Sequence, residues 1–316
     1  MNWVKKGLLF NVSGTEDWAA SHCHKPTPLL IDNDTIRIFF GVRDSTRHTR
    51  TTFLDAKVLD DGSLVVSYVH DRPVLDLGTI GAFDDSGVNV CSLVRRENTV
   101  YMYYIGWNPS TTVHTRNSIG LAVSADDGIT FQRLYQGAVL DRNKDEPFYT
   151  GAVDVRCELD GWKLWYTSGT EWKIINSKPE ICYHVKYATS VDGVDWIRRN
   201  QSCILPASAL EAVARPCVLL GSSGYKMWYS RRLIDGFRLN PKNGYRGGYA
   251  ESQDGMHWKR MDSAFGIDVS QYGWDSEAIA YPYLLGTKVK GYYFMFYNGN
   301  GFGQSGFGYA VSKDDI

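Results

Sequence analysis

A short apolar and aromatic triplet recurs five times along the chain. The copies are Ile38–Phe40, Met102–Tyr104, Leu164–Tyr166, Met227–Tyr229 and Met295–Tyr297. They end at residues 40, 104, 166, 229 and 297, so the repeat is about 63 residues long and five repeats fill the 316-residue chain. A long repeat built from short strands is typical of a β-propeller with one blade per repeat, and such a ring usually carries its site over the central channel.

A Ser-x-Asp turn follows the aromatic strand in every repeat from the second on. Asp and Ser side chains accept hydrogen bonds from turn amides, and a neighbouring glycine tolerates positive φ. The pattern therefore predicts a structural turn between the two outer strands of a blade rather than a binding motif. The copies are Ser124-Ala-Asp126, Ser190-Val-Asp192, Ser252-Gln-Asp254 and Ser312-Lys-Asp314.

The last repeat stops at Ile316, before any outer strand, and the missing strand is expected at the other end of the chain. Trp3–Phe10 is similar to the outer strands that begin at Phe131 and Trp196. We therefore predict an all-β fold, a single five-bladed β-propeller domain over residues 1–316, whose last blade is closed by the N-terminal strand. Closure of this kind removes two open sheet edges.

Charge and hydropathy exclude several classes of function. The chain has 34 Lys and Arg against 35 Asp and Glu, which gives no reason to expect a nucleic acid or an anionic membrane as partner. No apolar run approaches the roughly 18 residues of a membrane-spanning helix. The N-terminus lacks the features of a signal peptide, and the six cysteines lack metal-ligand spacing. We expect a cytoplasmic protein; its oligomeric state is not readable.

The residues that enter the first strand of each repeat are polar, although these strands lead into a packed core. Burying a charge is costly unless it is paired. An acid or base at the start of each first strand has two explanations. The charges could form structural ion pairs, such as Asp154 with Arg156 and Glu211 with Arg215. Alternatively, they form an acid/base cluster at the channel mouth, which is the interpretation we favour. The entries are Ser21–Lys25, Asp84–Gly87, Gly151–Val155, Glu211–Arg215 and Asp275–Tyr281.

Alignment of the apolar cores of the first strands places Arg156 level with Pro26, Pro216 and Pro282, and thus Asp154 at the mouth. Paired carboxylates suit glycosyl chemistry, because one acid protonates the leaving oxygen and another activates water or attacks directly. Trp107 is a candidate for stacking on a sugar, or for packing. The candidate catalytic acids are Asp85, Asp154, Glu211 and Glu277.

The whole chain resembles the five-bladed propeller glycosidases, the superfamily of arabinanases, β-xylosidases, invertases and levansucrases. The resemblance implies that Asp154, in Val153-Asp154-Val155-Arg156, is the third-blade Asp that stabilises the transition state. It likewise implies that Glu211, before Arg215-Pro216, is the fourth-blade general acid. It also implies a catalytic Asp before a proline in the first blade, but this chain has Lys25 before Pro26 there, and a lysine cannot be that carboxylate.

The missing carboxylate leaves three interpretations open. Another acid, Asp85, Glu277 or Asp44, supplies it. Alternatively, the chain resembles the related mannoside phosphorylases, with Asp154-Val155-Arg156 as a loose match to their Asp-Pro-Arg motif. In the third interpretation the propeller binds a glycan or a protein without chemistry.

A basic cluster is expected beside the acids. Arg and Lys favour phosphate or carboxylate, so the cluster fits inorganic phosphate or an acidic sugar equally. We expect a carbohydrate substrate, no cofactor and no metal ligands, although some members of the superfamily hold a cation in the channel. The long segments 44–52, 107–117, 170–181 and 231–246 are expected to shape the rim or an oligomer contact. The expected substrate-binding residues are His24, Lys25, Arg43, Asp44, Trp107, Arg156 and Arg215.

Overall fold

The structure is a computed structural model that describes residues 1–12, 14 and 16–316. Within this part of the chain the regular structure consists of β-strands and short 3-10 helices, so the predicted all-β class is confirmed. No helix among the described residues is long and apolar enough to cross a membrane. The 3-10 helices are Asp17–Ala19, Pro241–Asn243, Asp262–Ala264 and Asn300–Gly303.

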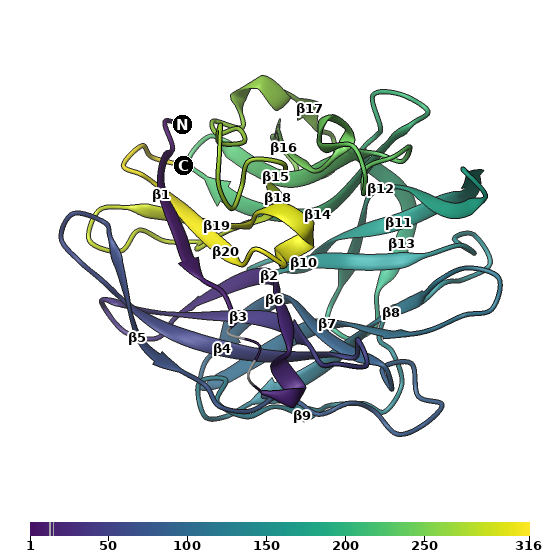
Figure 1. Cartoon of the computed structure of the whole chain (residues 1–316), viewed down its shortest axis with the longest axis horizontal. Coiled ribbons are helices and arrows are strands. Elements are labelled where there is room, and N and C mark those ends of the chain that lie inside the picture. Colours follow the sequence, from purple (N-terminus) through teal and green to yellow (C-terminus); the bar gives the residue numbers. More distant parts are fainter. Residues whose placement is uncertain (13, 15) are drawn as a thin grey trace.

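The strands form five antiparallel groups (Figure 1). One parallel bridge, between Thr49 and Gly87, joins the first two groups into an eight-stranded sheet. The first group is β2 (Ser21–Leu30), β3 (Thr35–Arg43), β4 (Thr49–Val58) and β5 (Leu64–Val69), and the second is β6 (Gly87–Arg96), β7 (Thr99–Asn108), β8 (Arg116–Ser124) and β9 (Gln132–Arg133). The third is β10 (Thr150–Glu158), β11 (Gly161–Ile175), β12 (Lys178–Ser190) and β13 (Ile197–Ile204). The fourth is β14 (Glu211–Gly221), β15 (Gly224–Leu233), β16 (Arg246–Ser252) and β17 (Lys259–Arg260), and the fifth is β18 (Ala280–Leu284), β19 (Tyr293–Asn298), β20 (Phe307–Ser312) and β1 (Val4–Phe10).

The N-terminal strand belongs to the same sheet as the C-terminal strands. β1 runs antiparallel to β20, from Val4 opposite Val311 to Phe10 opposite Phe307. Figure 1 shows β1, in purple, beside the yellow strand β20, with the two chain ends close together. The pairing therefore gives the last group a fourth strand that the C-terminal repeat itself lacks.

The first strands of the five groups contact one another in a closed order: β2 contacts β6, β6 contacts β10, β10 contacts β14, β14 contacts β18, and β18 contacts β2. The aromatic triplets lie on the second strands and fill the space between groups, with Trp165 and Trp228 among the largest fully buried side chains. Each triplet is buried because a strand in the middle of a sheet has neighbours on both faces and both edges.

The register between first and second strands corrects the sequence alignment. The middle residue of each triplet pairs with one residue of the first strand, and in the third group Trp165 pairs with Asp154. Asp154 is therefore level with the residue that follows Pro26, Pro216 or Pro282, and Arg156 is not level with those prolines. The residues opposite the triplets are Thr27, Ser92, Asp154, Cys217 and Tyr283.

The Ser-x-Asp segments form the predicted structural turns. Ser190 Oγ accepts a hydrogen bond from Gly193 N at 2.9 Å, and Asp192 Oδ1 accepts one from Val194 N at 2.8 Å. The copy at Ser252 repeats the arrangement, with Gly255 N donating to Ser252 Oγ at 2.9 Å. These bonds satisfy turn amides that have no strand partner, which accounts for the repetition of the motif without a binding role.

Candidate functional site

A cavity of about 830 Å³ lies where the first strands begin. Each first strand contributes to its wall, through His24 on β2, Asn89 on β6, Ala152 on β10, Arg215 on β14 and Tyr281 on β18. The four long segments complete the wall, which confirms that they shape a rim. Their lining residues are Arg47, Thr49, Trp107, His114, Thr115, Asn117, Lys178–Ile181, Arg232, Phe237, Arg238 and Tyr245.

Three of the first strands present a side chain to the cavity from the same kind of bulge. Lys25, Arg215 and Tyr281 each precede a proline and have positive φ values of 51°, 55° and 56°. The strand register is interrupted at each of them. Such a conformation costs a non-glycine residue about 1–3 kcal/mol and persists where the surrounding structure fixes it, as at active sites and ligand clamps. A β-bulge re-aims the side chain that it carries, and all three line the cavity.

Each bulge is held by a side chain on the second strand of the neighbouring group. The amide N–H of Lys25 donates to Asn298 Oδ1 at 2.7 Å, and that of Tyr281 donates to Ser230 Oγ at 2.8 Å. Arg215 N donates to Thr167 Oγ1 in the same way, at 3.2 Å. The bulge residues are thus fixed from two groups at once, which keeps their side chains in place around the cavity.

The cavity is strongly basic. Seven Lys and Arg residues line it against one acid, Glu180. The Glu180 carboxylate is itself 3.7 Å from the guanidinium of Arg238. Clustered charge of one sign in a concave, low-dielectric wall attracts ligands of the opposite sign, so the cavity favours an anion. The seven are Lys25, Arg43, Arg47, Lys178, Arg215, Arg232 and Arg238.

The Lys25 amine has no carboxylate partner among the described residues, and its nearest aromatic contact is Tyr281, whose ring centroid lies 5.1 Å from Nζ. Burial lowers the pKa of Lys25 to about 8, and the charges of Arg215 and Arg43 act in the same direction, against an opposing effect of Cys91. Near neutral pH this amine is therefore able to exchange a proton.

Two histidines beside Lys25 are neutral. The rings of His22 and His24 stack with their centroids 4.8 Å apart, and Arg43 Nη1 lies 3.3 Å from His22 Nε2. Burial and the Arg43 charge lower the pKa of His22 to about 4 and that of His24 well below its usual value. The buried Nε2 of His24 has no hydrogen-bond partner in the described part of the chain.

Arg215 closes the bottom of the cavity. It is fully buried, donates from Nη1 to the Cys91 carbonyl at 2.7 Å and from Nη2 to Thr27 Oγ1 at 2.8 Å. Its guanidinium stacks 4.6 Å from the centroid of Tyr283. Nη1 and Nη2 bond to β6 and β2, so Arg215 acts as a spacer between first strands, and its buried Nε has no hydrogen-bond partner among the described residues.

A cluster of tyrosines surrounds Arg232 in the cavity wall. Arg232 Nε donates to the Tyr183 hydroxyl at 2.9 Å, which lies 3.1 Å from the Tyr245 hydroxyl. Burial raises the pKa of Tyr183 and Tyr281 well above the usual value. For Tyr245 burial acts upward too, but Arg232 and the hydrogen bonds of Tyr183 and Tyr281 outweigh it and lower its pKa. The cluster can therefore share protons among neighbouring phenols.

Asp154 lies below the cavity and does not line it. Its carboxylate accepts hydrogen bonds from Ser92 Oγ at 3.2 Å, from Val218 N at 2.6 Å and from the Tyr283 hydroxyl. Burial raises its pKa, against the effect of Tyr283. These partners come from β6, β14 and β18, so Asp154 ties four first strands together.

Most of the other buried acids belong to a unit that repeats from group to group. The last tyrosine of a triplet donates to an acid, and a cation of the outermost strand pairs with that acid. In the second group Tyr104 donates to Asp84 at 2.9 Å, and Arg133 lies 2.8 Å from the same carboxylate. The other units are Tyr166–Glu146–Arg198, Tyr229–Asp262–Arg260 and Tyr297–Asp275–Lys5.

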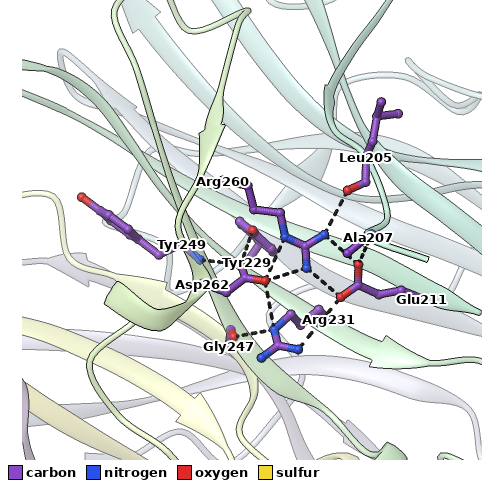
Figure 2. A network of polar contacts seen from close by, with 9 residues as sticks. All are labelled: Leu205, Ala207, Glu211, Tyr229, Arg231, Gly247, Tyr249, Arg260 and Asp262. Atoms are coloured by element: carbon purple, nitrogen blue, oxygen red, sulfur yellow. Dashed lines mark hydrogen bonds and ion pairs between the residues drawn. The ribbon is translucent and has the colours of Figure 1, made fainter.

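Glu211 extends the unit of the fourth group, as Figure 2 shows. Arg260 donates to its two oxygens at 2.7 and 2.6 Å, and Arg260 also lies 2.6 Å from Asp262. Arg231 is 4.0 Å away, and Ala207 N donates at 2.5 Å. Glu211 is 6% exposed and absent from the cavity wall. Its contacts are those of a structural ion pair.

The remaining predicted residues also lie outside the main cavity. Asp85 accepts from Gly81 N and Ser86 Oγ in a turn, and Asp44 caps its own loop and pairs with Arg50 at 2.7 Å. Arg156 pairs with Glu158 at 3.2 Å. Glu277 is exposed and lines a smaller pocket of about 170 Å³ that shares Phe237, Arg238, Tyr245 and Phe302 with the cavity.

The prediction that the candidate acids converge at the channel mouth is therefore wrong. None of Asp85, Asp154, Glu211 and Glu277 lines the main cavity, and the alternative pairs Asp154–Arg156 and Glu211–Arg215 do not form among the described residues. The predicted basic cluster does assemble there. The expected binding residues that line the cavity are His24, Lys25, Arg43, Trp107 and Arg215.

Sequence reasoning missed most of the far wall. Lys178, Glu180, Arg232, Arg238 and Tyr245 lie in the long segments whose position, but not whose residues, was predicted. The four arginines of 231–246 were the available signal. In the described part of the chain, no three His, Cys, Asp or Glu side chains are grouped as metal ligands.

Comparison with known proteins places the chain among relatives of its own length. It is 35% identical over 99% of its length to the whole of "Uncharacterized protein MT1551" of Mycobacterium tuberculosis strain CDC 1551. It is 34% identical, with the same coverage, to "Uncharacterized protein Rv1502" of strain H37Rv. The chain belongs to the family of these mycobacterial proteins. No family model matches it.

Solved structures of glycosidases share the fold of this chain. A structure named "Glycoside hydrolase" has a TM-score of 0.72 and 17% identity, covering 99% of this chain and 92% of that one. A thermostable family-43 glycoside hydrolase has a TM-score of 0.62 and 15% identity over 92% and 88% of the two chains. A structure from the GH130 family of mannoside phosphorylases has a TM-score of 0.63 and 15% identity over 95% and 87%.

Proposed function

We propose that the chain is a single five-bladed propeller, closed by β1, and that it is a carbohydrate-active enzyme whose site is the basic cavity. The five strand groups, the closed order of contacts among their first strands and the β1–β20 pairing support the propeller. Ligands of ring-shaped folds bind where the ring leaves a concave space, and the cavity is that space in this chain.

One observation carries the function: the cavity presents seven cations against one acid, and that acid is paired. We propose that the enzyme cleaves a glycosidic bond in a carbohydrate that bears, or reacts with, an oxyanion. Trp107 and Tyr149 in the wall supply the apolar faces on which sugar rings stack. The similar solved structures are named as glycoside hydrolases or belong to a family of mannoside phosphorylases, which supports a glycosidic bond as the target.

A phosphorylase is the second candidate, because the same cations suit inorganic phosphate. Arg43 favours this reading: it lines the cavity, and its side-chain contact is a neutral histidine rather than a carboxylate. In that case the oxyanion is the co-substrate and the sugar is neutral. In the first case the oxyanion is a carboxylate or phosphoryl group of the sugar itself.

The test is sugar release from aryl glycosides and short oligosaccharides, both neutral and uronic, with and without phosphate. We expect release by the wild type and at least a hundredfold loss in Arg43→Gln, since the cavity would lose a cation that holds the oxyanion. Arg72→Gln is the matched control, because Arg72 is an exposed arginine that pairs only with Asp71.

Each result assigns the chemistry. Release only with phosphate identifies the phosphorylase, and release from uronides without phosphate identifies an enzyme for acidic sugars. Equal activity of Arg43→Gln and wild type would contradict the proposal that the active site lies in this cavity. Tight glycan binding with no product from any substrate would replace the enzyme by a binding propeller.

A further inference from the structure

The cavity lacks the groups that ordinary glycoside hydrolysis uses. That reaction needs two carboxyl groups on either side of the bond, about 5–9.5 Å apart. Glu180 is the one carboxylate among the residues that line this cavity, and Arg238 lies 3.7 Å from it. Asp154 and Glu211 are engaged elsewhere, in bonds to β14 and to Arg260. Cleavage of a glycosidic bond here calls for a different pair of proton-transfer groups.

The cavity does contain an amine, phenols and guanidinium groups close together. The Lys25 amine lies over the ring of Tyr281, and Tyr281 packs against Tyr245 with ring centroids 5.1 Å apart. Arg43, from the neighbouring strand β3, faces the same cavity without a carboxylate partner among the described residues. An amine, a phenol and a guanidinium are a base, an acid and a carboxylate receptor.

We propose that this cavity cleaves 4-O-substituted uronides by β-elimination, with Arg43 on the substrate carboxylate, Lys25 as the base and Tyr281 as the acid. The inference rests on the proposed carbohydrate-active function and names its substrate class and reaction. A uronide carries both features that the cavity selects, a sugar ring and a carboxylate. The guanidinium also promotes the chemistry, because it stabilises the negative charge that develops next to the carboxylate when the neighbouring proton leaves.

The step balances without water, oxidant or cofactor. The amine of Lys25 takes the proton from C5, the carbon that bears the carboxylate, and the electron pair of that bond forms the C4–C5 double bond. The C4–O4 bond breaks with its pair on O4, and the Tyr281 phenol protonates O4. The products are a 4,5-unsaturated uronide and a sugar with a new end, and the proton on Lys25 returns to Tyr281 through solvent.

The backbone places base and acid on the same side of the cavity. Lys25 and Tyr281 occupy equivalent bulges on β2 and β18, which are adjacent first strands. Their backbone N–H groups donate hydrogen bonds to Asn298 Oδ1 and Ser230 Oγ, which fix the two bulges. C5 and O4 are close neighbours in one sugar ring, so a base and an acid this close together can serve both atoms of a single bound residue.

The surroundings of Lys25 favour its neutral form. His24 beside it on β2 is neutral, Arg43 on β3 and Arg215 on β14 are positive, and only Cys91 on β6 acts in the opposite direction among the groups that shift its pKa. Burial and the two guanidinium groups lower the pKa of Lys25 to about 8. An amine of this pKa is a far better base at neutral pH than an exposed lysine.

The experiment uses the full chain with oligogalacturonides and oligoglucuronides in water enriched in oxygen-18. Elimination gives products that absorb ultraviolet light through the new conjugated double bond and contain no oxygen-18. We expect such products, a rate that rises with pH to a plateau above about pH 8, and loss of at least a thousandfold in Lys25→Gln. Lys25→Arg keeps the positive charge and the fold, but an arginine side chain does not lose its proton near neutral pH and cannot act as the base. This variant should therefore be equally impaired. Arg72→Gln is the control.

Other outcomes distinguish failure of the elimination from failure of the proposed carbohydrate-active function. Oxygen-18 in a saturated product means hydrolysis, and a glycosyl phosphate means phosphorolysis; either overturns the elimination and leaves the enzyme proposal standing. A Lys25→Arg variant that eliminates at the wild-type rate with an unchanged pH profile removes Lys25 as the base. If no uronide is cleaved and its C5 proton does not exchange with deuterated water, the elimination is refuted, while cleavage of neutral glycosides still tests the function.

Discussion

Glu211→Gln distinguishes a structural acid from a catalytic one. The substitution keeps the shape of the side chain and the acceptor for Ala207 N, but it removes the charge that Arg260 meets with two hydrogen bonds at 2.7 and 2.6 Å. Of the two oxygens, the amide retains one acceptor, and its NH₂ group opposes the second guanidinium nitrogen. We therefore expect folding, not chemistry, to suffer.

The magnitude follows from the bonds lost. A hydrogen bond to a charged group contributes about 1.5–3 kcal/mol, and breaking a fully buried ion pair costs about 3–5 kcal/mol. The Glu211 side chain is 7% exposed but that of Arg260 is 21% exposed, so solvent reduces the loss. We expect about 2–3 kcal/mol, which corresponds to a fall in melting temperature of roughly 3–5 °C for a domain of this size.

Thermal melts and kinetics together make the assay. Turnover measured well below the melting temperature should stay within about threefold of wild type, whereas removal of a general acid costs about a hundredfold to ten-thousandfold. A double-mutant cycle with Arg260→Met should return a coupling energy of about 2 kcal/mol. An unchanged melting temperature combined with abolished turnover would refute the reasoning and restore Glu211 as the general acid.

Three further predictions concern charges in and below the cavity. Because burial raises the pKa of Asp154, the stability of the wild type falls as pH rises through that pKa; Asp154→Asn should melt higher at neutral pH, and the difference should vanish in melts at acid pH. The pKa of Lys25 is lowered to about 8, so wild-type stability should rise between about pH 8 and 10.4, the unfolded pKa. Lys25→Met should therefore melt higher at pH 7, with a gap that closes over this range. Phosphate or glucuronate at 100 times its Kd should stabilise the protein by about 2.7 kcal/mol, an effect that calorimetry should find in Arg72→Gln and not in Arg43→Gln.

The repeat was readable from the sequence because it is dictated by local chemistry. Alternation, aromatic content and turn residues act over a few positions, and each of the five copies had to satisfy the same packing. The structural turns at Ser190 and Ser252 were predictable for that reason. The outer-strand cation was readable too, since an aromatic two residues before Arg or Lys recurs at Arg133, Arg198 and Arg260 and at Lys5 on the N-terminal strand.

The chemistry of the cavity was decided by tertiary structure. Sequence spacing could not show that Asp154 lies opposite Trp165, because a shift of a few residues along a strand leaves the apolar pattern plausible but moves a side chain to another level of the channel. Nor could it show that Glu211 meets Arg260, 49 residues away. Whether a charged residue belongs to a binding site or to a structural ion pair depends on the partners that the tertiary structure brings together.

What the sequence determined was an all-β chain of repeated strand units with polar residues at their entries. What only the tertiary structure decided was which of those residues face the space at the centre. Bulges before three prolines turn Lys25 and Arg215, together with Tyr281, toward the cavity. Glu211 instead pairs with Arg260 within its group, and Asp154 accepts hydrogen bonds from three other first strands. The physical reason is that a buried carboxylate must be ion-paired or hydrogen-bonded, and here those partners come from long-range contacts that no local pattern encodes.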